Sequence, residues 1–208
     1  MKQKHDMSEL ELDERHAIRM EKRKAARNRM LSTKTREKGL LIVHTGKGKG
    51  KSTAAFGIVM RALGNNMKVG IIQFVKGKWE TGERSVLENF QENITIRTMG
   101  EGFTWDTQDR QRDIAAARSA WAAAQDMIND DTYDIILLDE LNIVLRYDYL
   151  PIDMIVKTLK NRRHDLHIIV TGRNAKAPLI EVADMVTEMT EIKHHFRSGV
   201  KAQRGIEF

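Results

Sequence analysis

The sequence contains no cysteine, only 2 prolines and few aromatic residues, which make up 6% of its 208 residues. Without cysteine the chain can form no disulfide, no thiolate-bound zinc or iron–sulfur site and no thiol nucleophile. Its longest purely apolar run covers only residues 120–124, whereas a membrane-spanning helix needs about 20 apolar residues. No apolar stretch follows the basic residues of the amino terminus, so no secretory signal is visible. These absences favour a cytoplasmic protein without a membrane partner.

Positive charge is concentrated in the first 39 residues. The whole chain carries 35 Lys and Arg against 29 Asp and Glu, a formal net charge of +6. Residues 1–39 hold 12 basic against 7 acidic side chains, whereas residues 40–208 hold 23 against 22. Because the body is almost neutral, the charge does not favour a general nucleic-acid-binding surface.

A helical arm is expected over residues 1–39. Residues 8–38 contain no proline or glycine and are rich in good helix formers. Ser8 followed by Glu11 is typical of a helix start, where each side chain caps a free backbone N–H. The apolar positions are too sparse for a core-facing stripe. We therefore expect a conditionally ordered lid that lies against another surface, with a frayed, solvated arm as the alternative.

Residues 40–208 are expected to form one α/β domain. Short aliphatic or β-branched runs, bounded by Gly, Asp or Asn, alternate with helical windows. Such alternation predicts a mostly parallel sheet with helices on both faces. The expected strands are 40–45, 69–74, 94–97, 133–138, 167–171 and 185–189, and the expected helices are 52–63, 83–90, 107–128, 152–161 and 178–182.

The strongest local signal is a glycine-rich loop after the first expected strand. Its alternating glycines let backbone N–H groups turn toward a phosphate, and the next helix adds its positive dipole end. Lys51 is expected to contact phosphate oxygens, and the Ser52 hydroxyl to ligate Mg²⁺. Thr45 stands where the usual pattern has glycine. The expected ATP-binding residues are Gly46, Lys47, Gly48, Lys49, Gly50, Lys51, Ser52 and Thr53.

Two carboxylates, Asp139 and Glu140, follow the apolar run of the fourth expected strand. A strand that delivers carboxylates at its carboxyl end is typical of the acidic group near the metal of P-loop proteins. We expect Glu140 to share the Mg²⁺ ion with Ser52. By themselves, these residues indicate Mg²⁺–nucleotide binding and no particular reaction.

A second glycine-containing loop carries two large aromatic residues, Phe103 and Trp105, within residues 100–106. Because the loop follows a strand, both rings could face a cleft at the carboxyl edge of the sheet. Packing of the two rings in the core is an equal alternative.

The motifs together resemble those of the P-loop class of ATP:cob(I)alamin (corrinoid) adenosyltransferases. The resemblance runs from about residue 40 to the carboxyl terminus. Two positions depart from the family pattern, with Lys47 where Asn is expected and Ser52 where Thr is common. The matching stretches are 46–57, 73–79, 82–84, 102–108, 138–141, 147–151, 171–173 and 200–206.

This resemblance implies a RecA-like P-loop fold and a transferase. The enzyme would move the 5′-deoxyadenosyl group of ATP to the cobalt(I) of a corrinoid and release triphosphate, in adenosylcobalamin biosynthesis or salvage. Lys51 would stabilise the leaving triphosphate. Phe103 and Trp105 would bind the corrin from below and keep cobalt(II) four-coordinate, which makes it easier to reduce.

The resemblance also implies the partners. The second substrate would be cob(II)alamin, reduced to cob(I)alamin, or a precursor corrinoid. A reduced flavoprotein such as flavodoxin would deliver the electron. The chain would form a homodimer, and the arm would close over the corrin site.

Two other functional classes stay open. One is a RecA-like ATPase stimulated by nucleic acid, whose basic arm grips a phosphodiester backbone. The other is a nucleotide-binding regulator without chemistry. The products distinguish them, because the ATPase releases orthophosphate and the transferase releases triphosphate.

The adjacent histidines His194 and His195 raise the question of a metal site. Adjacent side chains are expected to diverge, and no carboxylate lies at a zinc-like spacing. The pair is therefore not expected to hold a metal.

Overall fold

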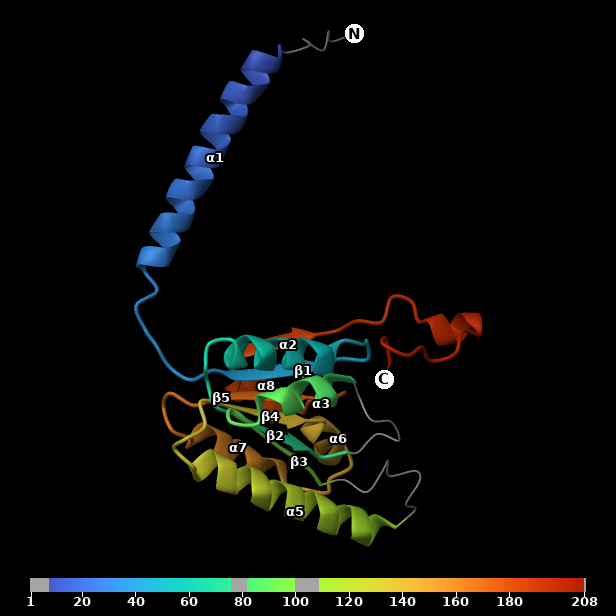
Figure 1. Cartoon of the computed structure of the whole chain (residues 1–208). Coiled ribbons are helices and arrows are strands. Elements are labelled where there is room, and N and C mark those ends of the chain that lie inside the picture. The colour runs from blue at the N-terminus through green and yellow to red at the C-terminus, as the bar shows by residue number, and fades with distance from the viewer. Residues whose placement is uncertain (1–7, 76–81, 100–108, 208) are drawn as a thin grey trace. The chain divides into compact units, whose positions relative to one another are not determined.

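The computed structural model describes residues 8–75, 82–99 and 109–207 (Figure 1). The chain divides into two compact units, residues 1–37 and 38–208, and each is described by itself. Along the described ranges, we find no helix long and apolar enough to cross a membrane.

The first unit is built around one helix, α1 (Glu9–Ser32). The predicted capping box is confirmed, because Ser8 and Glu11 exchange their capping hydrogen bonds. The helix is shorter than expected and ends before residue 38. The hydroxyls of Ser32 and Thr33 donate to the carbonyls of Arg29 and Met30, and such local bonds compete with helix continuation. No residue of α1 is buried.

The second unit contains a six-stranded sheet in which every strand pair is parallel. The strand order is β3-β2-β4-β5-β1-β6, so the first strand of the chain lies between the last two. The central strands are buried on both faces, which explains their continuous apolar runs. The strands are β1 (Leu41–Thr45), β2 (Val69–Gln73), β3 (Ile94–Thr98), β4 (Ile135–Asp139), β5 (His167–Thr171) and β6 (Met185–Glu188).

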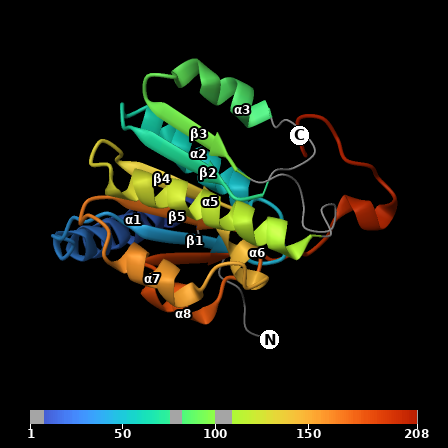
Figure 2. The same cartoon turned by 90° about the horizontal axis from the view of Figure 1, so that it is seen from below.

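Helices cover both faces of this sheet, as predicted. Phe56 and Val59 of α2 pack on one face, whereas Trp121 of α5 and Leu159 of α7 pack on the other. Figure 2 shows α5 and α7 lying across their face of the sheet. The helices are α2 (Lys51–Leu63), α3 (Gly82–Leu87), η1 (Glu88–Phe90), α5 (Arg110–Asn129), α6 (Leu141–Arg146), α7 (Ile152–Lys160), α8 (Ala177–Val182) and η2 (His195–Ser198).

One helix, α6, was not expected from the sequence. It begins directly after Glu140, whose backbone adopts a left-handed conformation with φ 61°. A helix of 6 residues is too short to show a helical period in its sequence. The chain therefore passes from β4 into α6 through this single left-handed residue.

The carboxyl ends of the parallel strands place polar residues at one edge of the sheet. Gln73 lies opposite Asp139 in the pairing of β2 with β4 and opposite Thr98 in the pairing of β2 with β3. Thr171 ends β5 two strands away from Gln73. The ends of parallel strands are the usual place for ligand sites in such sheets.

Candidate functional site

The glycine-rich loop connects β1 to α2 and packs against the chain just after β6. Gly46 has φ +97°, and a Cβ there would come within 2.4 Å of the Met189 carbonyl oxygen. The backbone N–H of Gly48 donates to that same carbonyl at 2.7 Å. Glycine is therefore required at residue 46 both by the backbone angle and by the close approach.

The loop leads to an open helix end. Gly50 precedes α2 with φ 98°, and no side chain of the described chain caps the N-terminus of this helix. The first backbone N–H groups of α2 lack helical acceptors, and the helix dipole places partial positive charge there. This end of α2 can therefore bind an anion such as a phosphate group.

Lys51 is the buried cation of the loop. Its ammonium donates to the carbonyl oxygen of Gly48, and its side chain is almost fully covered. Burial lowers the pKa of Lys51; the nearby Glu140 carboxylate raises it, and the charge of Arg173 lowers it further. An ammonium held this way is ready to contact phosphate oxygens with little water around it.

Of the other predicted loop residues with side chains, three are exposed and one bonds to the sheet. The exposed residues are Lys47, Lys49 and Thr53, and Lys49 forms an ion pair with Glu207 near the carboxyl terminus. The hydroxyl of Ser52 points to the sheet edge and donates to Asp139 at 2.9 Å. The structure thus brings Ser52 to Asp139, the first of the two strand-end carboxylates, rather than to Glu140.

Asp139 is the most heavily bonded carboxylate of the site. The hydroxyls of Ser52 and Thr171 both donate to its Oδ1, at 2.9 and 2.7 Å. Burial raises the pKa of Asp139, and the hydrogen bonds from Thr171, Ser52 and Gln73 oppose that rise. These bonds hold the carboxylate in one orientation at the end of β4.

Glu140 lies beside Asp139 but has a different environment. Its backbone N–H donates to the Thr171 hydroxyl at 2.9 Å, whereas its Oε2 is buried without a hydrogen-bond partner in the described residues. Burial raises the pKa of Glu140 to about 7, and the charge of Asp139 adds to the rise, which Lys51 opposes. Glycine suits residue 172, because its φ is +121° and a Cβ there would come within 2.9 Å of both Asn142 Cβ and Glu140 Oε2.

The donor set fits a Mg²⁺ ion. Mg²⁺ is bound by oxygen ligands, normally one or two carboxylates with substrate phosphates and water. Ser52, Asp139 and Glu140 supply a hydroxyl and two carboxylates, and Glu140 Oε2 is a buried oxygen that lacks a partner. The sequence had pointed to Ser52 and Glu140, and the structure adds Asp139 through its contact with Ser52.

Several residues of the site escaped the sequence analysis. The Thr171 hydroxyl donates to the Asp139 carboxylate and accepts from the Glu140 backbone N–H, and the buried Asn142 donates to the Gly172 carbonyl at 3.1 Å. Thr171 lies in the family-like stretch 171–173 and at a strand end, but neither signal gave it a role, and nothing in the sequence marks Asn142. Phe103 and Trp105, the predicted corrin-binding pair, lie outside the described residues.

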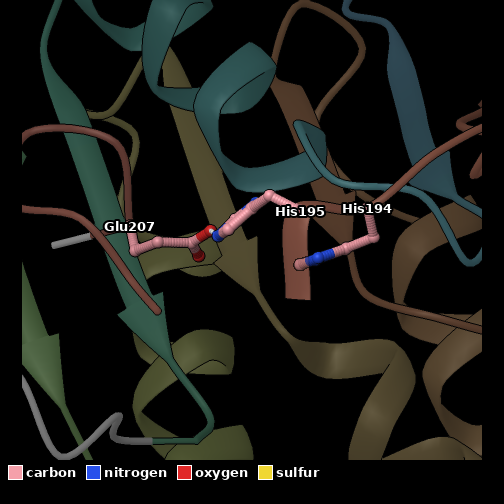
Figure 3. A group of neighbouring side chains, drawn as sticks. All are labelled: His194, His195 and Glu207. Atoms are coloured by element: carbon pink, nitrogen blue, oxygen red, sulfur yellow. Dashed lines mark ion pairs between the residues drawn. The ribbon is translucent and has the colours of Figure 1, made fainter. Parts of the chain in front are cut away.

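The arrangement of His194 and His195 corrects the sequence analysis. Their rings do not diverge but stack, with centroids 4.8 Å apart and an interplanar angle of 22°. A carboxylate is also close, because Glu207 Oε1 lies 3.4 Å from His195 Nε2 (Figure 3). The spacing argument failed because Glu207 approaches from a chain segment that follows η2. The three residues could come together around a metal ion.

We expect the free energy of unfolding to fall as the pH rises from about 4.5 to 7. The folded chain keeps the Glu140 proton up to about pH 7, whereas the unfolded chain loses it near 4.5. The folded state then binds more protons in this window, so a higher pH favours unfolding. Glu140→Gln should remove on the order of 3 kcal/mol of this fall, which corresponds to the raised pKa.

Denaturant titrations at pH 5 and pH 8, without nucleotide or magnesium, measure the effect. Glu181→Gln, at an exposed carboxylate of α8, is the matched control and should keep the wild-type profile. Asp139, whose pKa burial also raises, contributes in the same direction to the slope that remains in the Glu140 variant. Identical pH profiles for wild type and Glu140→Gln would contradict the assignment.

Comparison with known proteins identifies the family. The model of the ATP:corrinoid adenosyltransferase family BtuR/CobO/CobP matches residues 37–208. A corrinoid adenosyltransferase of Sinorhizobium sp is 54% identical over 198 residues, which cover 94% of this chain and 92% of the relative. A corrinoid adenosyltransferase of Escherichia coli K12 is 44% identical over 196 residues, covering 94% and 99%. Among solved structures, the RadB recombinase is similar at 12% sequence identity and a TM-score of 0.47. The match covers 76% of this chain and 77% of the recombinase chain. The chain therefore belongs to the ATP:corrinoid adenosyltransferase family.

Proposed function

We propose that the glycine-rich loop holds the triphosphate of ATP while the 5′-deoxyadenosyl group moves to the cobalt(I) of a corrinoid. As a member of its family, the chain is a transferase enzyme whose substrates are ATP and a corrinoid. The observation that carries the proposal is the buried Lys51 ammonium between the loop and Glu140, at the open end of α2. This arrangement supplies positive charge where triphosphate would leave.

The reaction is a displacement at the 5′ carbon of ATP. Cobalt(I) donates an electron pair to that carbon, and the bond to the 5′ oxygen breaks with its electrons on the triphosphate. The nucleophile needs no protein base, so the protein has to orient the sugar and stabilise the departing charge. Lys49, Lys51 and the loop N–H groups would do so. Mg²⁺ held by Ser52, Asp139 and Glu140 would neutralise further triphosphate charge when bound.

A direct assay separates this function from a nucleic-acid-stimulated ATPase, which the family membership does not favour. The full chain is incubated with ATP, Mg²⁺ and chemically reduced cobalamin. The adenosylcobalamin spectrum together with triphosphate supports adenosyl transfer. Release of orthophosphate, stimulated by DNA or RNA, would overturn it.

Lys51→Ala should lower turnover by roughly 10²-fold or more, because it removes a buried cation from the leaving triphosphate. Lys157→Ala, at an exposed lysine of α7, is the matched control and should keep wild-type turnover. Initial rates at saturating ATP, with chemically generated cob(I)alamin, measure both variants. Near-normal turnover of the Lys51 variant would exclude the proposed role.

We further propose, from the family resemblance, that Phe103 and Trp105 bind beneath the corrin and exclude the lower ligand of cobalt(II). A lost donor ligand raises the reduction potential, and an apolar wall keeps water from replacing it. A reduced flavoprotein such as flavodoxin is the proposed electron donor. The protein is proposed to act in the cytoplasm as a homodimer.

Phe103→Ala should therefore damage the route from cob(II)alamin far more than the route from preformed cob(I)alamin. One assay supplies cob(II)alamin with reduced flavodoxin, and the other supplies chemically generated cob(I)alamin. A large loss in the first and a modest loss in the second is the expected result. Equal losses would reduce the role of Phe103 to corrin binding, and no loss in either would place it outside the site.

The arm of residues 1–39 is proposed as a lid over the corrin. In its favour, α1 is a long capped helix with exposed apolar side chains, among them Leu10, Ile18 and Met30. Deleting residues 1–37 should leave ATP binding intact, because the phosphate loop belongs to the other unit. The KM for the corrinoid should rise or turnover should fall. Unchanged corrinoid kinetics in the truncated protein would make the arm a passive tail.

A further inference from the structure

A chain of three charged or polar side chains leads from the phosphate loop to the carboxyl-terminal segment. The Lys49 ammonium forms an ion pair with Glu207 Oε2. The other carboxylate oxygen, Oε1, lies 3.4 Å from His195 Nε2, as Figure 3 shows for the two side chains. Lys49 and Glu207 are 158 residues apart in the sequence. The end of the chain therefore contacts the loop that is proposed to hold triphosphate.

Glu207 is the least exposed member of this chain. Its side chain is 12% exposed, compared with 46% for Lys49 and 30% for His195. Its hydrogen bond with Lys49 and the positive charge of Lys49 lower the pKa of Glu207. Glu207 is thus a covered, ionised carboxylate with Lys49 as its principal partner. The contact with His195 is incomplete, because Oε1 and Nε2 are both buried atoms without a hydrogen bond in the described structure.

The proposed function creates a conflict at Lys49. Its ammonium is expected to move onto the triphosphate, which is a stronger anion than one carboxylate. The largely covered Glu207 carboxylate would then lose its cation, and a carboxylate with little access to water is less stable without a partner. Lys49 and His195 also line the same open pocket of about 270 Å³, so their side chains face a common space. A second cation near Glu207 would remove the conflict.

We propose that Glu207 is a positioning residue for Lys49, and that His195 takes up a proton and becomes the partner of Glu207 when Lys49 moves to the triphosphate. This inference rests on the proposed function, in which Lys49 contacts triphosphate. The proton comes from solvent, neutral imidazole becomes imidazolium, and no covalent bond changes. Histidine suits this exchange because its ordinary titration range lies near neutral pH.

The surroundings of His195 favour a proton over a metal ion. Ligation through His194 Nδ1 would compete with the Phe196 N–H, which donates to that nitrogen at 3.2 Å. A metal ion at Glu207 Oε1 would also be repelled by the Lys49 ammonium, which is paired with Oε2 of the same carboxylate. The remaining charged residues at the cavity add no free carboxylate, because Glu191 pairs with Arg197 at 2.5 Å and Lys193 is a further cation.

The test is the number of protons taken up when MgATP binds to the full chain. Isothermal titration calorimetry at pH 7.5, in HEPES and in Tris, gives this number from the different ionisation enthalpies of the two buffers. Wild type should take up roughly half a proton to one proton more than His195→Gln. The wild-type Kd for ATP should also rise with pH more steeply than the Kd of His195→Gln, with an additional increase of up to about tenfold per pH unit. Other groups, Glu140 included, cancel in this difference.

Two further variants make the result specific. Glu207→Gln should give the same proton number as His195→Gln, because the imidazole then has no carboxylate to pair with. His194→Asn is the matched control, since its side-chain oxygen can still accept from the Phe196 N–H, and it should keep the wild-type proton number. A merely structural role of Glu207 would not change the proton number.

The outcomes separate this inference from the proposed function. If wild type binds MgATP with the same proton number as His195→Gln and Glu207→Gln, the exchange does not occur and the inference is wrong. If His194→Asn also takes up fewer protons than wild type, the assignment to His195 is wrong as well. If the wild-type chain shows no MgATP binding, the proposed function fails first, and the inference falls with it.

Discussion

The hydrogen bonding of the Asp139 carboxylate is the constraint on which the site depends. A buried carboxylate is stable only when its oxygens are bonded. Ser52 from α2 and Thr171 from β5 both donate to Asp139, and Gln73 from β2 lies opposite it in the sheet. Thr171 and Gln73 reach Asp139 only if β2, β4 and β5 pair in the observed register. The register of the sheet and the position of the phosphate loop are therefore fixed together.

The parts of the fold that depend on local sequence could be predicted. The apolar runs predicted both ends of each of the six strands to within two residues, and the glycines predicted the loop before α2. The extent of α1 was misjudged, because hydrogen bonds from Ser32 and Thr33 to the preceding turn end it early. The helix α6 was missed because its 6 residues are too few to show a helical period.

Contacts between distant segments could not be predicted. The sequence identified Asp139 and Glu140 as a pair of carboxylates, but not that Ser52 would bond to the first of them. The different environments of the two carboxyl groups come from the positions of Thr171 and Gly172, which belong to another strand end. No spacing rule could place Glu207 beside Lys49 or His195.

The support of the phosphate loop by Met189 has a consequence for the synthesis of the protein. Strand β1 lies between β5 and β6, and the Met189 carbonyl that receives the Gly48 N–H follows β6. Proteins are made from the amino terminus, so the loop leaves the ribosome long before its support does. A nascent chain that ends before β6 holds all the loop residues but lacks the surface that shapes them. The loop therefore takes its observed conformation only after the chain beyond β6 has been added.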